Sequence, residues 1–240
     1  MENIKKYLLR KQEDVLTIIN EDFKSIEDIV NNHIIPYLPI KNVKDNGYVK
    51  FHKFYLTLLV DTGSSNSLKK PNNFNEKAFF SQFKIKYSLQ GISNEYLDYL
   101  TENKENIIKL INEDNIHDLF FNYFAKAQIK HKETFKSKEL SSFFAKLLHT
   151  FKPNEYCALD NPIKDYFDLK RESFLIAFFC INAAYEKWNS NANNINNLRE
   201  KIKDIDTKND LQVDLLSNKK ILDMVYWHKA NVKKDKNTEG

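Results

Sequence analysis

Apolar residues recur along most of this chain at the three- and four-residue spacing of amphipathic helices. The clearest stretch is Phe51, Phe54, Tyr55, Leu58 and Leu59, in which successive apolar side chains fall on one face of a helix. The same pattern predicts helices over residues 25–35, 75–87, 93–100, 104–111, 116–127, 137–151, 161–168, 171–188, 195–205 and 219–232. We expect Pro36 to end the helix over 25–35, because proline lacks the amide N–H that continues a helix.

The segment 171–188 differs from the other predicted helices because it is apolar almost all round. Its apolar positions are Phe174, Leu175, Ile176, Phe178, Phe179 and Ile181. A helix without a polar face is expected at the centre of a bundle.

Glycine and proline are scarce, with 4 Gly and 5 Pro among 240 residues. Sheet proteins need many tight turns, and those turns favour these residues. We therefore expect an all-α protein, a multi-helix bundle with an N-terminal helical region. The prediction is one helical domain over residues 1–240, with a subdivision near 63–73 or 130–138 as the alternative.

The charge balance is slightly positive, with 37 basic and 33 acidic residues, and arginine occurs only at positions 10, 171 and 199. Arginine provides the planar fork that reads guanine edges, whereas lysine acts as a hydrated point charge. An excess of lysine therefore favours solubility or diffuse contact with a nucleic-acid backbone over base-specific recognition.

Several classes of site and location are not expected. Cys157 and Cys180 are too few for a disulfide framework, and the histidines show no metal-ligand spacing, so we predict no metal. No glycine-rich nucleotide motif occurs, so we predict no cofactor. The longest apolar run, residues 174–181, is too short to span a membrane, and the first residues lack a signal-peptide core. The expectation is a soluble cytoplasmic protein without a membrane partner.

The sequence Asp61-Thr62-Gly63 is similar to the nucleophile loop of pepsin-like aspartic proteases. That chemistry needs two such loops, because two neighbouring carboxyl groups share one proton. No second Asp-Thr-Gly or Asp-Ser-Gly occurs, and the flanking pattern is helical. We therefore predict a helix that ends near Asp61 with Gly63 as its C-terminal cap.

Residues 137–169 form the best specified local pattern in the chain. Ser137 is a predicted N-cap for an amphipathic helix, and Lys146 and His149 are expected on the polar flank of that helix. A proline-containing loop follows, and then Asp160 precedes Asn161-Pro162, as expected of an N-cap residue.

This segment, with Ala-Lys on one helix and Leu-Asp-x-x-Ile opening the next, resembles the core of helix-hairpin-helix DNA glycosylases and their degenerate bacterial relatives. The resemblance implies that Asp160 assists loss of a base and that Lys146 attacks the sugar carbon. The hairpin glycines of that family are missing, since no glycine lies between Gly91 and Gly240. The alternative is that Asp160 only caps a helix, with Lys146 a solvated charge.

Positive charge is concentrated between Lys126 and Lys146, where six lysines stand against two glutamates. The predicted nucleic-acid-binding residues are Lys126, Lys130, Lys132, Lys136 and Lys138. We therefore expect a nucleic-acid-associated protein that contacts the backbone of DNA or RNA, with a degenerate glycosylase-like or genome-defence role. The alternative function is a non-catalytic helical module that binds a protein partner in a bacterial or phage-related complex. The alternative explanation of the lysine cluster is a solvated helix face.

Overall fold

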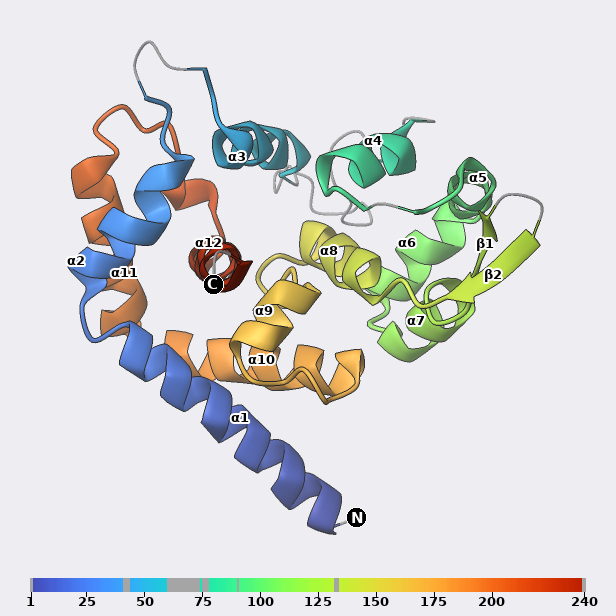
Figure 1. The fold of residues 1–240 in the computed structure, drawn as a ribbon, viewed down its shortest axis with the longest axis horizontal. Helices are drawn as coiled ribbons and strands as arrows, with labels where there is room; N and C mark the ends of the chain where they lie inside the picture. Colours follow the sequence, from blue (N-terminus) through green and yellow to red (C-terminus); the bar gives the residue numbers. More distant parts are fainter. Residues whose placement is uncertain are drawn as a thin grey trace. The chain divides into compact units, whose positions relative to one another are not determined.

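The computed structural model describes residues 2–40, 44–59, 74, 78–89, 91–131 and 134–238. Helices account for nearly all of the regular structure in these ranges, so the predicted all-α multi-helix fold is confirmed (Figure 1). The chain forms two compact units, one made of residues 1–49 with 152–240 and the other of residues 50–151. We call them the terminal unit and the central unit and describe each by itself.

The terminal unit contains helices from both ends of the chain. They are α1 (Glu2–Asp22), α2 (Ile26–Ile29), the π-helix η1 (Val30–Ile34), the 3-10 helix η2 (Ile35–Tyr37), α9 (Asn161–Tyr166), α10 (Phe174–Asn189), α11 (Ala192–Ile205), the 3-10 helix η3 (Val213–Leu215) and α12 (Asn218–Thr238). Helix α3 (Gly47–Leu58) begins in this unit and continues into the central unit.

Helix α10 has the central place in the terminal unit that its apolar sequence predicts. It packs along α1, as Figure 1 shows, and also contacts α9, α11 and α12. Its residues Ala177, Phe178, Ile181 and Tyr185 are completely buried. One side remains open, however, because Phe179 is 50% exposed.

The predicted helix over 25–35 changes type along its length. Ser25 caps α2 by accepting a hydrogen bond from the amide of Asp28 at 3.2 Å, and the following turn is the π-helix η1. Val30 and Ile34 of η1 are buried, whereas His33 remains half-buried. Pro36 then lies in the first turn of η2, where its missing N–H leaves no helical hydrogen bond unmade.

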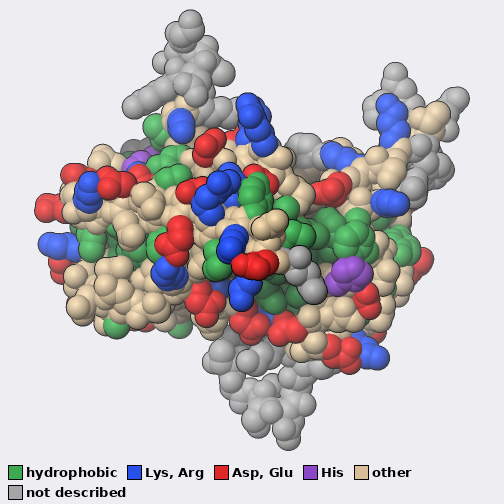
Figure 2. Space-filling model, turned by 90° about the horizontal axis from the view of Figure 1, so that it is seen from below, with side chains coloured by type: hydrophobic (Ala, Val, Ile, Leu, Met, Phe, Trp, Pro, Cys, Tyr) green, Lys and Arg blue, Asp and Glu red, His purple; other side chains and the backbone are tan. Residues whose placement is uncertain are grey.

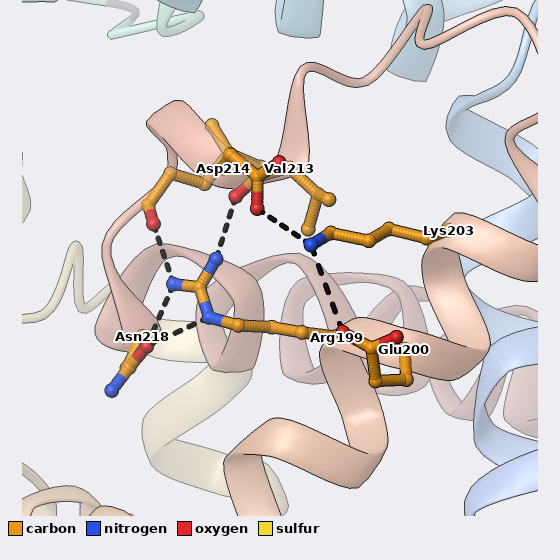
Figure 3. A network of polar contacts seen from close by, with 7 residues as sticks. Arg199, Glu200, Lys203, Val213, Asp214 and Asn218 are labelled. Carbon is orange, nitrogen blue, oxygen red and sulfur yellow. Dashed lines mark hydrogen bonds and ion pairs between the residues drawn. The ribbon is translucent and has the colours of Figure 1, made fainter.

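Arg199 organises the irregular connection between α11 and α12 (Figure 3). Its guanidinium donates to the carbonyl oxygens of Val213 at 2.6 Å and Leu216 at 2.7 Å. It also donates to the side chain of Asn218 at the start of α12, at 2.7 Å. Burial lowers the pKa of Arg199. A single side chain of α11 is thus tied to η3 and to the start of α12.

The central unit is built from shorter elements. They are α4 (Phe79–Lys86), α5 (Asn94–Glu102), α6 (Lys104–Asn112), α7 (Ile116–Tyr123), β1 (Ala127–His131), β2 (Thr134–Lys138) and α8 (Ser141–Phe151), together with most of α3.

Helix α8 forms the core of the central unit. All of its residues from Phe143 to Phe151 are buried. Phe143 stacks on Phe83 with ring centres 5.3 Å apart, and Phe144 meets Phe120 edge-on at 5.0 Å. Aromatic pairs of this kind add to the free energy gained from burial alone.

Two predicted boundaries in this unit are wrong. The helix over 137–151 begins only at Ser141, so Ser137 lies in β2 and is not its N-cap. The helix over 116–127 ends at Tyr123 and is followed by the antiparallel pair β1–β2, in which Ala127 faces Lys138. The residues between these helices lack the helical spacing of apolar side chains, which explains why the helix does not continue.

Some predicted features lie outside the described residues. These are the Asp61-Thr62-Gly63 sequence with its predicted cap and the proposed subdivision near 63–73. The other proposed subdivision, near 130–138, coincides with the β1–β2 hairpin inside the central unit. In the part of the chain that the structure describes, no helix combines the length and apolarity needed to cross a membrane.

Candidate functional site

Lys146 lies inside the central unit rather than on a solvated helix flank. Lys146 is only 8% exposed, and its Nζ lies 5.7 Å from the centre of the Tyr87 ring. A cation over an aromatic face is stabilised by the negative potential of the ring. The hydroxyl oxygen of Tyr87 lies 3.3 Å from that of Thr150, which is on α8 together with Lys146.

His149, the other residue that the sequence predicts on the polar flank of this helix, is completely buried. Its ring is stacked on that of Tyr55, and its Nε2 is 3.1 Å from the Tyr55 hydroxyl. The predicted polar flank is therefore wrong. Aromatic side chains of the central unit pack against α8, and the Tyr55 hydroxyl gives the buried imidazole a hydrogen-bond partner.

Asp160 caps α9, as its position before Asn161-Pro162 predicts. Its Oδ1 accepts a hydrogen bond from the amide of Ile163 at 3.3 Å. Its Oδ2 accepts a second hydrogen bond, from the indole Nε1 of Trp227 on α12, at 3.2 Å. Both carboxylate oxygens therefore have partners within the terminal unit, and the residue is only 7% exposed.

The two predicted catalytic residues belong to different units. Lys146 lies in the central unit and Asp160 in the terminal unit, and each is held by contacts within its own unit. A shared catalytic role for this pair therefore stays a prediction.

A second carboxyl group, Asp223, lies deep in the terminal unit close to Asp160. It is 4% exposed, and its Oδ2 accepts a hydrogen bond from the amide of Ala158 at 2.6 Å. Burial raises the pKa of Asp223 to about 7, and the nearby charge of Asp160 acts in the same direction. Its protonated form is therefore favoured relative to that of a solvated aspartate.

Two lysines at the start of α12 oppose this shift in the pKa of Asp223. Lys220 and Lys219 are 4% and 3% exposed, and the charge of each lowers the pKa. The Nζ of Lys219 donates to the carbonyl oxygen of Glu155 at 2.5 Å and lies 3.5 Å from the carboxylate of Glu186. The buried charges of this cluster are thus partly compensated.

Cys157 borders the same cluster and has the role of a small apolar side chain. It is completely buried, and burial raises the pKa of its thiol well above the ordinary value. A thiol must lose its proton to act as a nucleophile, so this environment makes Cys157 inert.

His33 and His228 form a further polar pair in the terminal unit. The Nδ1 atoms of the two rings are 2.9 Å apart, although the residues are 195 positions apart in sequence. Burial is the main cause that lowers both pKa values, that of His33 to about 4. The Tyr48 ring lies 5.0 Å from the rings of both His228 and Trp227, centre to centre.

The β1–β2 hairpin carries the predicted nucleic-acid-binding lysines. Lys126, Lys136 and Lys138 are exposed. Lys130 belongs to β1, but its side chain is outside the described part of the structure, and Lys132 is outside it entirely. Lys136 and Lys138 are two residues apart in β2, so they project from the same face of the hairpin.

An apolar groove of about 610 Å³ lies between α1 and α10 in the terminal unit. Its walls include Leu8, Leu9, Phe179 and Ala183. Phe179 and Leu9 are about half exposed, at 50% and 49%. Contiguous exposed apolar surface of this kind is typical of a place where another molecule binds.

Sequence reasoning missed the two most unusual polar groups of the terminal unit. Asp223 stands among Ile221, Leu222, Met224 and Val225, so a carboxylate inside an apolar helical run was an available signal. The pairing of His33 with His228 left no such signal, because neither residue has a metal-binding or catalytic spacing to a neighbour in sequence.

Comparison of the chain with protein-family models, with curated proteins and with solved structures finds no match. A function can therefore be proposed only from the contacts of the described residues and from the resemblance of residues 137–169 to the core of helix-hairpin-helix DNA glycosylases.

The two roles of Asp160 can be separated by substitution. Asp160→Asn keeps an acceptor for the amide of Ile163 but places an NH2 group opposite the indole N–H of Trp227, so its stability should lie between those of the wild type and the alanine variant. Asp160→Ala removes both acceptors and should lower the free energy of unfolding by about 1–3 kcal/mol. Urea unfolding of the two variants measures this. Equal stability of the alanine variant and the wild type would contradict the capping role.

Proposed function

We propose that this chain binds nucleic acid through contacts between the lysines of the β1–β2 hairpin and the phosphate backbone. The observation that carries the proposal is the exposure of Lys126, Lys136 and Lys138 on and beside this one small hairpin. A two-stranded ribbon fits the grooves of a duplex, and lysine neutralises phosphate without reading bases.

The surroundings of the hairpin support a local binding surface. The hairpin contacts α5 and lies at the edge of the helices of its unit in Figure 1. On the face that Figure 2 draws, Lys and Arg side chains are interspersed with Asp and Glu side chains. A face of mixed sign gives a polyanion little attraction, so in this proposal the lysines of the hairpin provide the attraction.

In this proposal residues 137–169 supply fold rather than chemistry. Both oxygens of Asp160 accept hydrogen bonds, and Lys146 is enclosed beside Tyr87. These contacts favour a degenerate glycosylase-like core, in which the segment persists as a structural element, over base removal.

A salt series tests the proposed binding. We expect the full chain to bind a fluorescent duplex DNA or RNA with an affinity that falls steeply as salt rises, because bound lysines release counterions. Replacing Lys126, Lys136 and Lys138 together by Gln should weaken binding about tenfold or more at low salt. The slope of log affinity against log salt should decrease by about 2–3, because each lysine that neutralises a phosphate contributes roughly one to it.

A matched variant separates local contact from net charge. Lys170, Lys201 and Lys208 of the terminal unit are also exposed, and their replacement by Gln changes the net charge by the same amount. This control should bind nearly as tightly as the wild type. The proposal fails if the wild type shows no binding at low salt, or if the two triple variants lose affinity equally.

The apolar groove between α1 and α10 favours a second function, as a helical module that binds a protein partner. The groove follows α1 from Glu2 to Gln12, about 15 Å or three helical turns, so we propose an amphipathic helix as its ligand. Half-exposed Phe179 would be the aromatic anchor of the interface.

Site-specific photocrosslinking tests this second function. A benzoyl-phenylalanine at position 179 should give one discrete adduct in cells, and Leu8→Asp in the groove wall should abolish it. The matched control carries the probe at Ile85 of the central unit, which is 70% exposed. Absence of an adduct from position 179, or the same adducts from both positions, would exclude a partner at the groove.

A further inference from the structure

The charged side chains that line the groove between α1 and α10 come from α1. The described residues of α10 in the lining are Phe179, Cys180 and Ala183, none of which carries a charge. Glu2 and Lys5 of α1 are the charged residues of the lining. The sign of the charge that a ligand meets in the groove therefore depends on the first turns of α1.

Basic residues predominate in these turns. Between residues 2 and 12, Lys5, Lys6, Arg10 and Lys11 stand against a single acidic residue, Glu2. The amino-terminal end of a helix also carries a partial positive charge. This stretch of α1 therefore attracts negatively charged groups.

Ion pairs compensate two of the four basic residues. The Nζ of Lys6 is 2.9 Å from the carboxylate of Glu2, and the Nζ of Lys11 is 3.5 Å from that of Glu172. Lys5 makes no ion pair with any residue that the structure describes. Because Glu2 already pairs with Lys6, exposed Lys5 contributes an uncompensated positive charge to the groove.

The next acidic residue along α1 does not offset this charge. Glu13 lies beyond Gln12, the last lining residue of α1, and its carboxylate is 2.5 Å from the Nζ of Lys187 on α10. This pair is neutral overall. Lys5 is therefore the residue of the groove that distinguishes ligands of opposite charge.

The shape and the charge of the groove favour one class of ligand. Two helices wall it, and its exposed apolar side chains are Ile4, Leu9 and Phe179, at 66%, 49% and 50%. A helix fits between two such walls, whereas the flat surface of a bilayer would leave the groove unfilled. A second copy of the chain would bring the same basic stretch of α1 against itself, and like charges repel.

We propose that the groove binds an acidic amphipathic helix of a protein partner. The apolar face of this helix would meet Phe179 and Leu9, and a carboxylate at the edge of that face would pair with Lys5. This inference rests on the proposed second function, to which it adds the charge of the partner. The pairing also fixes the register of the helix, because a single lysine marks one end of an otherwise apolar groove.

Two synthetic peptides test the sign of the charge. Both have about 14 residues, roughly four helical turns, with leucines at i, i+3, i+4 and i+7 on one face. One carries Glu at the positions that flank the leucines, and the other carries Lys. Fluorescence anisotropy with the full chain should show that the Glu peptide binds about fivefold or more tighter at low salt. The difference should shrink as salt rises, because exposed charges are screened.

Two variants with matched changes in charge locate the effect. Lys5→Glu should weaken binding of the Glu peptide about fivefold and strengthen binding of the Lys peptide. The control, Lys208→Glu, changes an exposed lysine elsewhere in the terminal unit by the same charge and should leave both affinities nearly unchanged. Phe179→Ala should weaken both peptides about tenfold, and it truncates a half-exposed side chain, so the fold should be kept.

The outcomes separate the acidic partner from the groove itself. Equal affinity of the two peptides, or equal effects of Lys5→Glu and Lys208→Glu, would overturn the acidic partner but leave the groove as a docking site. Binding of neither peptide, or binding that Phe179→Ala does not change, would overturn the groove and the second function together. Dimerisation or cosedimentation with phosphatidylserine vesicles that depends on Phe179, without peptide binding, would instead identify a second copy or a membrane surface.

Discussion

The terminal unit depends on the hydrogen bond that the amide of half-buried Ala158 donates to the buried carboxylate of Asp223. The loop that carries Ala158 is also held by the Nζ of Lys219, through the carbonyl of Glu155, and by Asn182, which accepts from the amide of Cys157 at 2.8 Å. These three contacts fasten the loop to α10 and α12. The loop in turn determines where Asp160 lies and therefore where α9 begins.

This arrangement gives the terminal unit a chain of hydrogen bonds and ring contacts that runs from α9 to η1. Asp160 links the first turn of α9 to Trp227, and the Trp227 ring packs against Tyr48. Tyr48 in turn contacts the ring of His228, which pairs with His33. A buried carboxylate is costly unless it is paired and hydrogen-bonded, so each of these partners has a structural role whatever the chain binds.

Whether a feature of this structure can be predicted from the sequence depends on how far apart its residues are along the chain. The helices and the cap at Asp160 follow from spacing and from residues three apart, which are local properties. The burial of Lys146 and His149 cannot be predicted from local sequence, because it results from aromatic side chains on α3 and α4 and in the turn that follows α4. The pairing of His33 with His228 is likewise beyond local reasoning, since it depends on how η1 and α12 meet.

Desolvation, opposed by the hydrogen bond from Ala158 and by the charges of Lys220 and Lys219, determines the protonation of Asp223. The most direct test is a pH titration of the Asp223 carboxyl carbon by ¹³C NMR, assigned by comparison with Asp223→Asn. The structure predicts a midpoint near pH 7. A midpoint near pH 4, the ordinary value for aspartate, would show that the carboxylate is solvated and would contradict this account.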